Sequence, residues 1–410
     1  MLRITADEYR KRLEALQGSV EDRDLDLFLV TSLDSIYYLT GAGFEPLERP
    51  FFLLVRPRLM PLLLVPKLEQ EHMNMACNVS DDNIHTYWDY PAPPGRGWPE
   101  RLQELIGNAD EIGVEPTLCQ EFSLKLNDYT LRVEGLVEDS RLIKSETEIA
   151  LIQRAAGYAD FGVQCLLGAS YQGATVAEGL AQTRSVSTRI IQEVEDWDPL
   201  TTKVTMATWA APRSAQPHSI PDLCDSLKEG PHVALVLTRV NGYAAENERT
   251  YFTTSPSAES KRAFEAMRQA RRLALDQVRP GLPCSELDGV VNDFLEREGY
   301  GGEEVRLHRI GHGLGLGNHE APWVAEGSPH VLAENMVISI EPGIYLKGLG
   351  GFRHSDTVLV TREGCRSLTD FPTDLESLTI TKWKPWTRLK GWWTRRVLRL
   401  NCEGRVSTGV

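Results

Sequence analysis

The sequence lacks several features that mark whole classes of protein. No apolar run approaches the roughly 20 residues needed to span a bilayer, and residues 1–8 lack the apolar core of a signal peptide. Cys-x-x-Cys pairs, internal repeats and low-complexity segments are also missing. The seven cysteines are odd in number and far apart, which is typical of a reducing compartment rather than of a disulfide framework. We therefore expect a globular, cytoplasmic protein whose 410 residues form two or more domains.

Positive charge is scarce except near the C-terminus. The chain has 44 Lys and Arg against 58 Asp and Glu, a net charge of −14. This balance excludes a general nucleic-acid binder, because phosphate binding draws on clustered positive charge. Residues 382–405 hold eight Lys or Arg and one Glu, so the remaining chain carries about −21. We therefore treat 382–410 as a separate basic tail.

The basic tail also contains four tryptophans. Docking onto the acidic body of the protein, or partial disorder, is the simpler expectation for such a segment. The alternative is weak contact with an anionic membrane surface, where indole rings and cations both find partners.

The pattern of apolar residues predicts two folded domains. Residues 1–141 alternate helical and strand patterns, which indicates an α/β domain. In residues 142–381, capping boxes begin helices at Ser145 and Thr175, and further helical patterns cover 257–278 and 285–298. Predicted strands of this second domain cover four segments: 232–240, 243–252, 336–346 and 356–360.

The pair Asn241-Gly242 lies between two β-rich runs and predicts a two-residue hairpin turn. In that register Leu235 faces Glu248 and Leu237 faces Glu246. Because strand side chains alternate, both glutamates lie on one face of the sheet in an apolar patch. We expect at least one of them to have a raised pKa, since two buried acids repel and lose solvation. Two glutamates facing solvent on a strand is the alternative that an isolated pair would favour.

Four segments in a fixed order carry a resemblance to a known family. They are Glu246-Asn247-Glu248-Arg249-Thr250, the run from Gly311-His312-Gly313 to His319-Glu320-Ala321-Pro322, Glu341-Pro342-Gly343, and Arg353-His354-Ser355-Asp356-Thr357. Their order resembles the pita-bread hydrolases, which include aminopeptidase P, prolidase, methionine aminopeptidase and creatinase. The resemblance implies an α+β fold: a curved antiparallel sheet flanked by helices, preceded by a smaller α/β domain of the creatinase type. It also implies a homodimer.

The resemblance implies a metal site with altered ligands. The peptidases of the family hold two metal ions with five ligands, at the positions of Leu235, Glu246, His312, Glu341 and Ser355. Leucine cannot bind a metal, and serine replaces a bridging glutamate. We therefore favour no metal cofactor, with a single divalent ion (Mn, Fe, Co or Zn) on Glu246, His312 and Glu341 as the alternative.

The creatinase branch, which works without metal, supplies roles for the remaining residues. Its pattern places a glutamate directly before Arg-Thr, as Glu248 stands here, and a histidine near the scissile bond, as His218 stands here. His218 and Glu248, together with Glu341 and His319, are the predicted catalytic residues. Glu246, His312 and Arg353 are predicted to bind substrate. The alternative for His218 is a histidine on a surface loop without a catalytic role. For Arg353 two interpretations are equally strong: an ion pair at the surface, or a guanidinium that binds a substrate carboxylate with two hydrogen bonds.

The favoured function from sequence is a metal-independent, creatinase-like hydrolase that cleaves a C–N bond in a small amidine, guanidino or peptide-like substrate. The first alternative is a mononuclear, metal-dependent Xaa-Pro dipeptidase or aminopeptidase. The second is a catalytically inactive pita-bread protein that only binds a peptide or partner.

Overall fold

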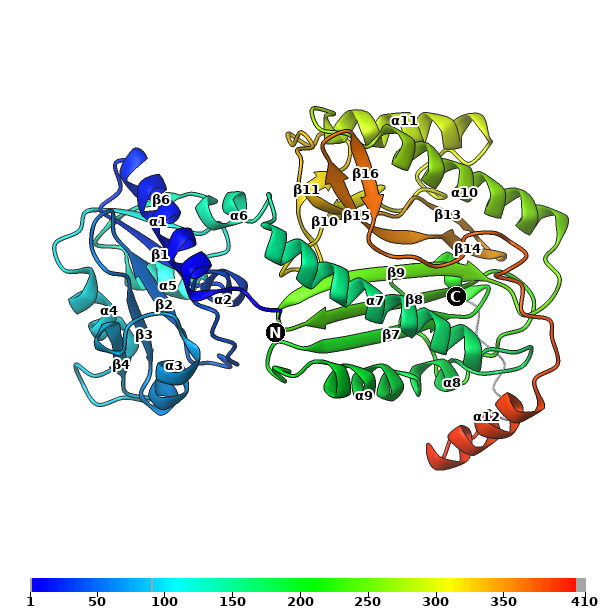
Figure 1. Ribbon diagram of the computed structural model, residues 1–410, viewed down its shortest axis with the longest axis horizontal. Coiled ribbons are helices and arrows are strands. Elements are labelled where there is room, and N and C mark those ends of the chain that lie inside the picture. The colour runs from blue at the N-terminus through cyan, green and yellow to red at the C-terminus, as the bar shows by residue number, and fades with distance from the viewer. Residues whose placement is uncertain (1, 90, 403–410) are drawn as a thin grey trace. The chain divides into compact units, whose positions relative to one another are not determined.

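Residues 2–89 and 91–402 are described by the computed structural model, and they form two compact units that join between Leu142 and Ile143 (Figure 1). The last part of the basic tail, residues 403–410, lies outside the described residues.

The N-terminal unit is a mixed α/β domain built on one sheet. Its described elements are α1 (Ala6–Asp22), β1 (Leu27–Val30), α2 (Leu33–Thr40), β2 (Phe52–Val55), β3 (Leu62–Pro66), α3 (Gln70–Ala76), β4 (Ile84–Tyr87), α4 (Trp98–Ile106), β5 (Glu111–Val114), α5 (Gln120–Lys125), β6 (Thr130–Val133) and α6 (Leu136–Ser140). Over these described residues the sheet has the order β4-β3-β2-β1-β5-β6. Strand β1 pairs in parallel with β5 and antiparallel with β2.

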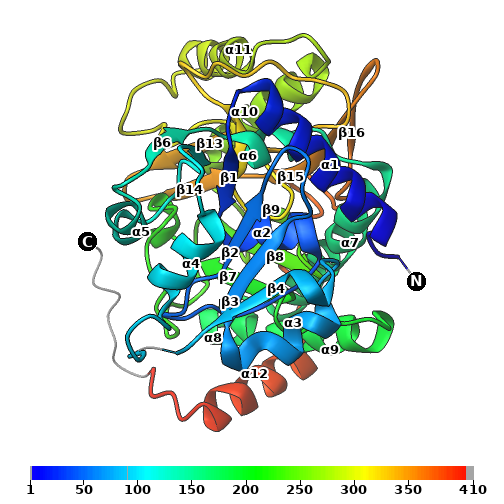
Figure 2. The same cartoon turned by 90° about the vertical axis from the view of Figure 1, so that its left-hand side faces the viewer.

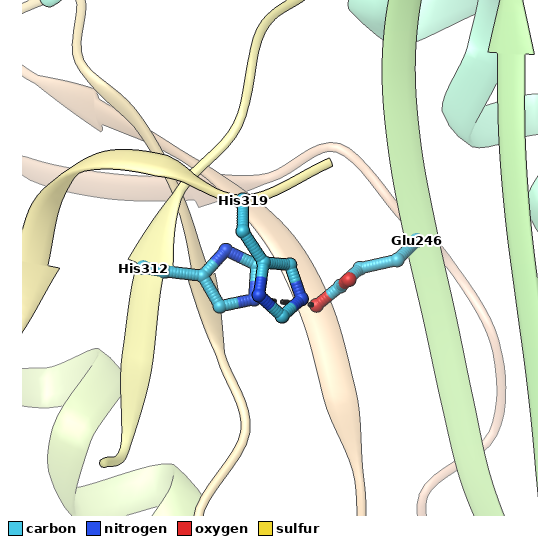
Figure 3. A group of neighbouring side chains, drawn as sticks. All are labelled: Glu246, His312 and His319. Carbon is cyan, nitrogen blue, oxygen red and sulfur yellow. Dashed lines mark ion pairs between the residues drawn. The ribbon is translucent and has the colours of Figure 1, made fainter. Parts of the chain in front are cut away.

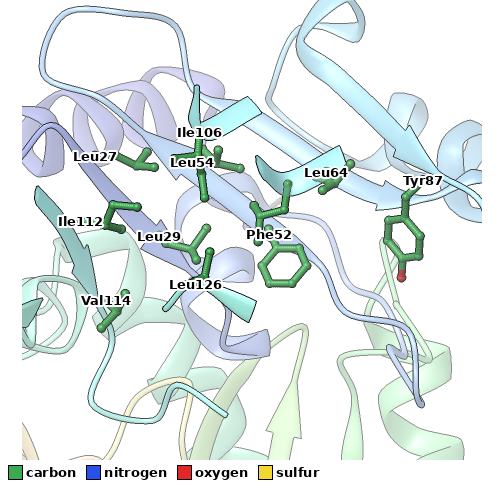
Figure 4. Packing of buried hydrophobic residues seen from close by; sticks show 11 residues of the cluster. Leu27, Leu29, Phe52, Leu54, Leu64, Tyr87, Ile106, Ile112, Val114 and Leu126 are labelled. Carbon is green, nitrogen blue, oxygen red and sulfur yellow. The ribbon is translucent and has the colours of Figure 1, made fainter. Parts of the chain in front are cut away.

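A separate hydrophobic core stabilises this unit (Figure 4). Leu27 and Leu29 of β1 are two residues apart, so they point to the same face of the sheet. Phe52 and Leu54 of β2 pack beside them, and the ring of Phe122 contacts Phe52 edge-on, with ring centroids 5.1 Å apart. The predicted α/β domain is confirmed.

The C-terminal unit is a curved antiparallel sheet flanked by helices, as predicted. Its described elements are α7 (Glu146–Ala169), α8 (Val176–Leu180), α9 (Thr183–Glu193), β7 (Lys203–Trp209), β8 (His232–Val240), β9 (Tyr243–Tyr251), α10 (Ala258–Gln277), α11 (Cys284–Arg297), β10 (Gly311–Gly313), β11 (Glu320–Val324), β12 (Val337–Ile340), β13 (Gly343–Leu346), β14 (Gly350–Arg353), β15 (Ser355–Thr361), β16 (Gly364–Ser367) and α12 (Pro385–Val397). The sheet runs β11-β10-β12-β15-β9-β8-β7, with β16 on β15 and a separate β13-β14 pair.

Helix α7 packs closely on strands β8 and β9. Both predicted capping boxes are present, at Ser145 with Glu148 and at Thr175 with Glu178. In the middle of α7, a Cβ on Gly162 would lie only 2.5 Å from a methyl carbon of Val236, so the helix lies directly against the sheet. Helix α7 therefore supports strands β8 and β9 from one face of the sheet.

The hairpin of β8 and β9 has the predicted register. Asn241 and Gly242 both have positive φ, 47° and 87°, as the two-residue turn requires. Leu235 pairs with Glu248, and Leu237 pairs with Glu246. Both glutamates are 2% exposed, so they face the interior and not solvent.

One predicted strand is divided in two. The segment 336–346 forms β12 and β13, with Glu341-Pro342 between them. Proline has no N–H to donate to a strand ladder, so the strand is interrupted at Pro342. The N–H of Glu341 still donates to the carbonyl of Ile310 at 2.7 Å and continues the pairing of β12 with β10, so Glu341 lies at the end of β12 next to β10.

Arg249, which is fully buried, fixes the strand that carries both glutamates. Its guanidinium contacts the Asp356 carboxylate at 2.8 Å and donates to the carbonyls of Glu248 and Ser355 at 2.7 and 3.0 Å. Burial would raise the pKa of Asp356, but Arg249 and Arg271 outweigh it and hold that pKa well below its usual range. β9 and β15 are therefore joined by a buried ion-pair network.

Replacing Arg249 with methionine is expected to lower the free energy of unfolding by about 3–5 kcal/mol. The change removes the central cation of the network and leaves the Glu248 and Ser355 carbonyls without their donor. Urea denaturation measures the loss. The control is Arg272→Met on α10, where the arginine side chain is 76% exposed and the expected change is within about 0.5 kcal/mol. Equal midpoints for the two variants would contradict the structural role of Arg249.

The tail forms helix α12, which packs beside α8 at the rim of the C-terminal unit (Figures 1 and 2). Docking, the simpler expectation for this segment, is therefore confirmed for residues 385–397. The expectation of unpaired cysteines is wrong for one pair, since a disulfide joins Cys224 to Cys402 across 178 residues of sequence. No spacing motif signals a bridge over that separation.

Candidate functional site

Neighbouring strands bring three predicted site residues together in the C-terminal unit. His312 of β10 is opposite Ser339 of β12, which is opposite Thr357 of β15, and Thr357 hydrogen-bonds to Glu246 of β9. This row across the sheet places the His312 ring 3.7 Å from Glu246, measured from Nε2 to Oε1. The carboxylate of Glu341, the residue that follows β12, lies 3.3 Å from the same Nε2 atom.

His319 completes the cluster from the loop that precedes β11. One ligand atom each from Glu246, His312 and His319 lies within 4.8 Å of the others (Figure 3). The two imidazole rings are in contact, with centroids 3.9 Å apart and planes tilted by 30°. Glu246 and His312 are buried, whereas His319 is exposed. The interior side of the cluster is therefore buried, and the side formed by His319 is accessible to solvent.

Two serines orient the Glu246 carboxylate. Ser355 donates to its Oε1 atom at 2.6 Å, and Ser339 donates to the same oxygen. The two hydroxyls also contact each other at 2.9 Å. One carboxylate oxygen is thus held in place while the group stays directed toward His312.

The charges of the cluster depend on one another. Burial raises the pKa of Glu246. Burial would lower the pKa of His312, but the carboxylates of Glu246 and Glu341 outweigh it and raise this pKa to about 9. Burial also opposes ionisation of Glu341, yet His312 and His308 bring its pKa well below the usual range. The predicted raised pKa of a hairpin glutamate is confirmed.

Glu248 lies beside the cluster and pairs with Arg353. Both residues are buried, and the Arg353 guanidinium contacts the Glu248 carboxylate. Burial raises the pKa of Glu248 to about 8 even though Arg353 acts in the opposite direction. Arg353 is thus part of an internal ion pair at the site and does not lie on the surface.

The two remaining histidines differ in environment. His218 is exposed on the loop before β8, and its charge lowers the pKa of both His308 and His319, which indicates that it lies near them. Burial, with a contribution from His312, lowers the pKa of His319 to about 4. His319 is therefore a neutral imidazole at pH 7 that can donate or accept a proton at a hydrogen bond.

Sequence reasoning missed three residues of the site. His308 is buried, and its Nε2 lies 2.7 Å from the hydroxyl of Tyr345. Ser339 contacts Glu246 directly. The position of His308 four residues before His312 was the only available signal, because Ser339 and Tyr345 enter through strand pairings that the sequence does not state.

The donor atoms suit one divalent cation. Among the described residues, His312 Nε2 is buried and makes no hydrogen bond of good geometry, although two carboxylate oxygens lie within 3.7 Å of it. An imidazole nitrogen and carboxylate oxygens that converge in this way are the ligand set of zinc, manganese or iron sites. Leu235 and Ser355, the two positions at which the resemblance implies metal ligands, supply no carboxylate.

Comparisons with known proteins place both units in established families. Residues 175–362 match the model of metallopeptidase family M24, and residues 12–143 match the creatinase/prolidase N-terminal domain. The chain is 28% identical over 380 residues to a Xaa-Pro dipeptidase of Lactobacillus delbrueckii subsp. lactis, an alignment that covers 90% of this chain and 99% of the relative. A Xaa-Pro dipeptidase of Pyrococcus furiosus is also 28% identical, over 372 residues that cover 89% of this chain and 99% of the relative.

Solved structures agree with the sequence relatives. The prolidase from Pyrococcus horikoshii OT3 superposes with a TM-score of 0.75 at 26% identity, covering 89% of this chain and 99% of that one. Dipeptidase PepE from Mycobacterium ulcerans superposes with a TM-score of 0.78 at 25% identity, covering 93% and 100%.

These findings correct two expectations from the sequence. The favoured metal-independent, creatinase-like hydrolase is wrong, since the matching family is one of metallopeptidases and the relatives are named Xaa-Pro dipeptidase. The preference for no metal cofactor is wrong for the same reason. The error came from counting the ligands lost at positions 235 and 355, whereas the retained groups converge on one atom of His312.

Proposed function

This chain belongs to the pita-bread family of creatinase, aminopeptidase P and prolidase, and on that premise we propose that it is a Xaa-Pro dipeptidase with one divalent metal ion. Glu246, His312 and Glu341 would hold the ion, and His319 lies close enough to join them. The observation that carries the proposal is the buried His312 Nε2, which faces two carboxylates without a hydrogen bond of good geometry. The substrate class rests on the names of the relatives.

When bound by these residues, a divalent ion would supply Lewis acidity for cleavage of the peptide bond. The protein groups supply orientation and proton transfer. Glu248 and Arg353 contact each other and form a fixed wall of the site. His319, exposed and neutral, is the group that can donate a hydrogen bond to the oxygen on which negative charge develops.

His218 is the second exposed histidine of the proposal. The cleaved bond leaves an imino nitrogen on proline that must gain a proton before it departs. An imidazole on a loop near His319 can deliver that proton and recover it from solvent.

Metal removal and reloading test the proposal. After chelator dialysis, hydrolysis of Xaa-Pro dipeptides should fall by at least about a hundredfold, because a Lewis acid contributes several kcal/mol to such a reaction. Reloading with Mn, Fe, Co or Zn should restore activity at one equivalent per chain. An Ala-Ala dipeptide is the matched substrate control and should be cleaved poorly throughout.

Two outcomes would contradict the proposal in different ways. Full activity in chelator, with no bound metal, would remove the metal requirement. One bound equivalent without hydrolysis of any Xaa-Pro dipeptide would instead favour the inactive binding protein that the sequence left as an alternative.

The family also suggests a homodimer of the cytoplasm, and we include both in the proposal. Light scattering of the purified chain tests the dimer, and a monomer at micromolar concentration would contradict it.

A further inference from the structure

Helix α12 docks onto the protein through its polar side. The Lys384 ammonium lies 3.3 Å from the carbonyl of Leu167 and 3.4 Å from that of Ser170, at the C-terminal end of α7, where the helix dipole favours a cation. Arg388 donates to the carbonyl of Gln172 at 3.2 Å, and its guanidinium lies 4.7 Å from the ring centre of Tyr171. These contacts attach the first two turns of the helix.

A partly buried ion pair attaches the rest of the helix. Arg395 contacts the carboxylate of Glu178, which is 3% exposed. Between the two anchors, a Cβ on Gly391 would lie 2.6 Å from the hydroxyl oxygen of Tyr171, which precedes α8, and 2.8 Å from Oε1 of Glu178 within α8. The inward face of α12 is therefore specific, and the helix has one fixed orientation.

The outward face of α12 is apolar. Trp386, Leu389, Trp393 and Val397 follow the spacing of one helical stripe, and they are 76, 55, 63 and 62% exposed. We call these four residues the outer stripe. An ordinary surface helix places its apolar stripe against the core and its charges in water, and α12 has the reverse arrangement. An outer stripe of this kind marks an interaction surface.

Cations flank the outer stripe, and their positive charge favours an anionic partner. Lys382 and Lys390 are exposed beside it, on a chain whose remainder carries about −21. We propose that α12 lies in the headgroup layer of an anionic lipid bilayer, with the outer stripe inserted and the lysines on lipid phosphates. Indole rings favour this depth, and lysines bind the negative surface. The acidic body is repelled by the same surface, so contact is confined to α12.

Two features favour a membrane surface over a second copy of the chain. The outer stripe exposes roughly 500 Å² of side chain, less than the roughly 800 Å² that each partner of a stable protein interface buries. Across the described residues, no helix is long and apolar enough to cross a bilayer, so we infer that α12 lies on the membrane surface and does not span it. The inference does not depend on the proposed peptidase activity.

Vesicle flotation of the full-length protein tests the inference. We expect binding to vesicles with 30% phosphatidylserine in phosphatidylcholine at least about tenfold tighter than to pure phosphatidylcholine. Trp386→Ser with Trp393→Ser should abolish flotation. The matched control changes two exposed tryptophans elsewhere, Trp88→Ser with Trp197→Ser, and should leave it unchanged.

A charge reversal separates insertion from electrostatic attraction. Lys382→Glu with Lys390→Glu should weaken binding by at least about tenfold, because each surface cation contributes about 1 kcal/mol. Its control is Lys261→Glu with Arg262→Glu, two exposed cations on α10. The far-UV circular dichroism spectrum and the thermal unfolding midpoint of every variant report that the fold is intact.

Three outcomes would overturn the inference. They are no flotation of the wild-type protein, equal binding to neutral and anionic vesicles, and flotation that survives loss of both stripe tryptophans. A dimer in light scattering that dissociates on Trp386→Ser with Trp393→Ser, without any flotation, would assign the outer stripe to a second copy instead.

Discussion

Replacing His312 with alanine is expected to remove the bound metal ion and to lower kcat/KM for Xaa-Pro dipeptides by about a thousandfold. His312 Nε2 is the atom on which both carboxylates converge, 3.3 Å from Glu341 and 3.7 Å from Glu246. Without it the buried nitrogen between the two acids is lost, and His319, the other imidazole of the cluster, is exposed. Loss of a Lewis acid that contributes several kcal/mol gives a change of this size, since each 1.36 kcal/mol is tenfold in rate.

His330→Ala is the matched control for this variant. His330 is a partly buried histidine whose ring contacts Ser328 away from the site. Metal content by elemental analysis and kcat/KM should both stay at the wild-type level. His312→Gln keeps a polar side chain of similar length and serves as the second variant if alanine prevents folding. One full equivalent of metal in either His312 variant would disprove the assignment.

The alternation of strand side chains made much of the hairpin predictable. Asn241-Gly242 fixes the turn, and the register then places Glu246 and Glu248 on one face without further information. The raised pKa values of both glutamates follow from burial, which the apolar partners Leu235 and Leu237 indicate in the sequence.

Contacts between distant segments were not predictable in this way. The pairing of β10 with β12 sets Ser339 opposite His312, and no local pattern states which strands will be neighbours. The Glu248 and Arg353 ion pair and the bridge from Cys224 to Cys402 join residues more than 100 positions apart. Each contact depends on the tertiary arrangement of the chain. The sequence therefore could not decide whether Arg353 forms a surface ion pair or binds a substrate carboxylate.

The metal prediction failed for a related physical reason. A ligand set is a geometry, and a list of ligands gained or lost does not say whether the remaining ones meet. Here Glu246 is held by two serine hydroxyls, one of them Ser355 itself. Ser355, which was counted as a loss, therefore positions the carboxylate of Glu246.

Restoring carboxylates with Leu235→Asp and Ser355→Glu is expected to raise bound metal from one to two equivalents per chain. Leu235 and Ser355 are both opposite Glu248, on β8 and β15, so the new acids would lie in one row on either side of it. The resemblance to the peptidases implies metal ligands at these two positions. Elemental analysis after reloading with Mn or Co measures the change.

Stability gives a second measurement of the same variant. Without metal, two added acids near Glu246 and Glu248 should lower the free energy of unfolding by about 3–5 kcal/mol, because buried charges of one sign lack partners. A saturating metal at a hundred times its Kd should return about 2.7 kcal/mol, since it binds only the folded chain. Leu235→Asn with Ser355→Gln has the same shape without the charge and controls for packing. If that control also bound two equivalents, or if the acidic variant bound only one, the missing carboxylates would not be what limits this site to a single ion.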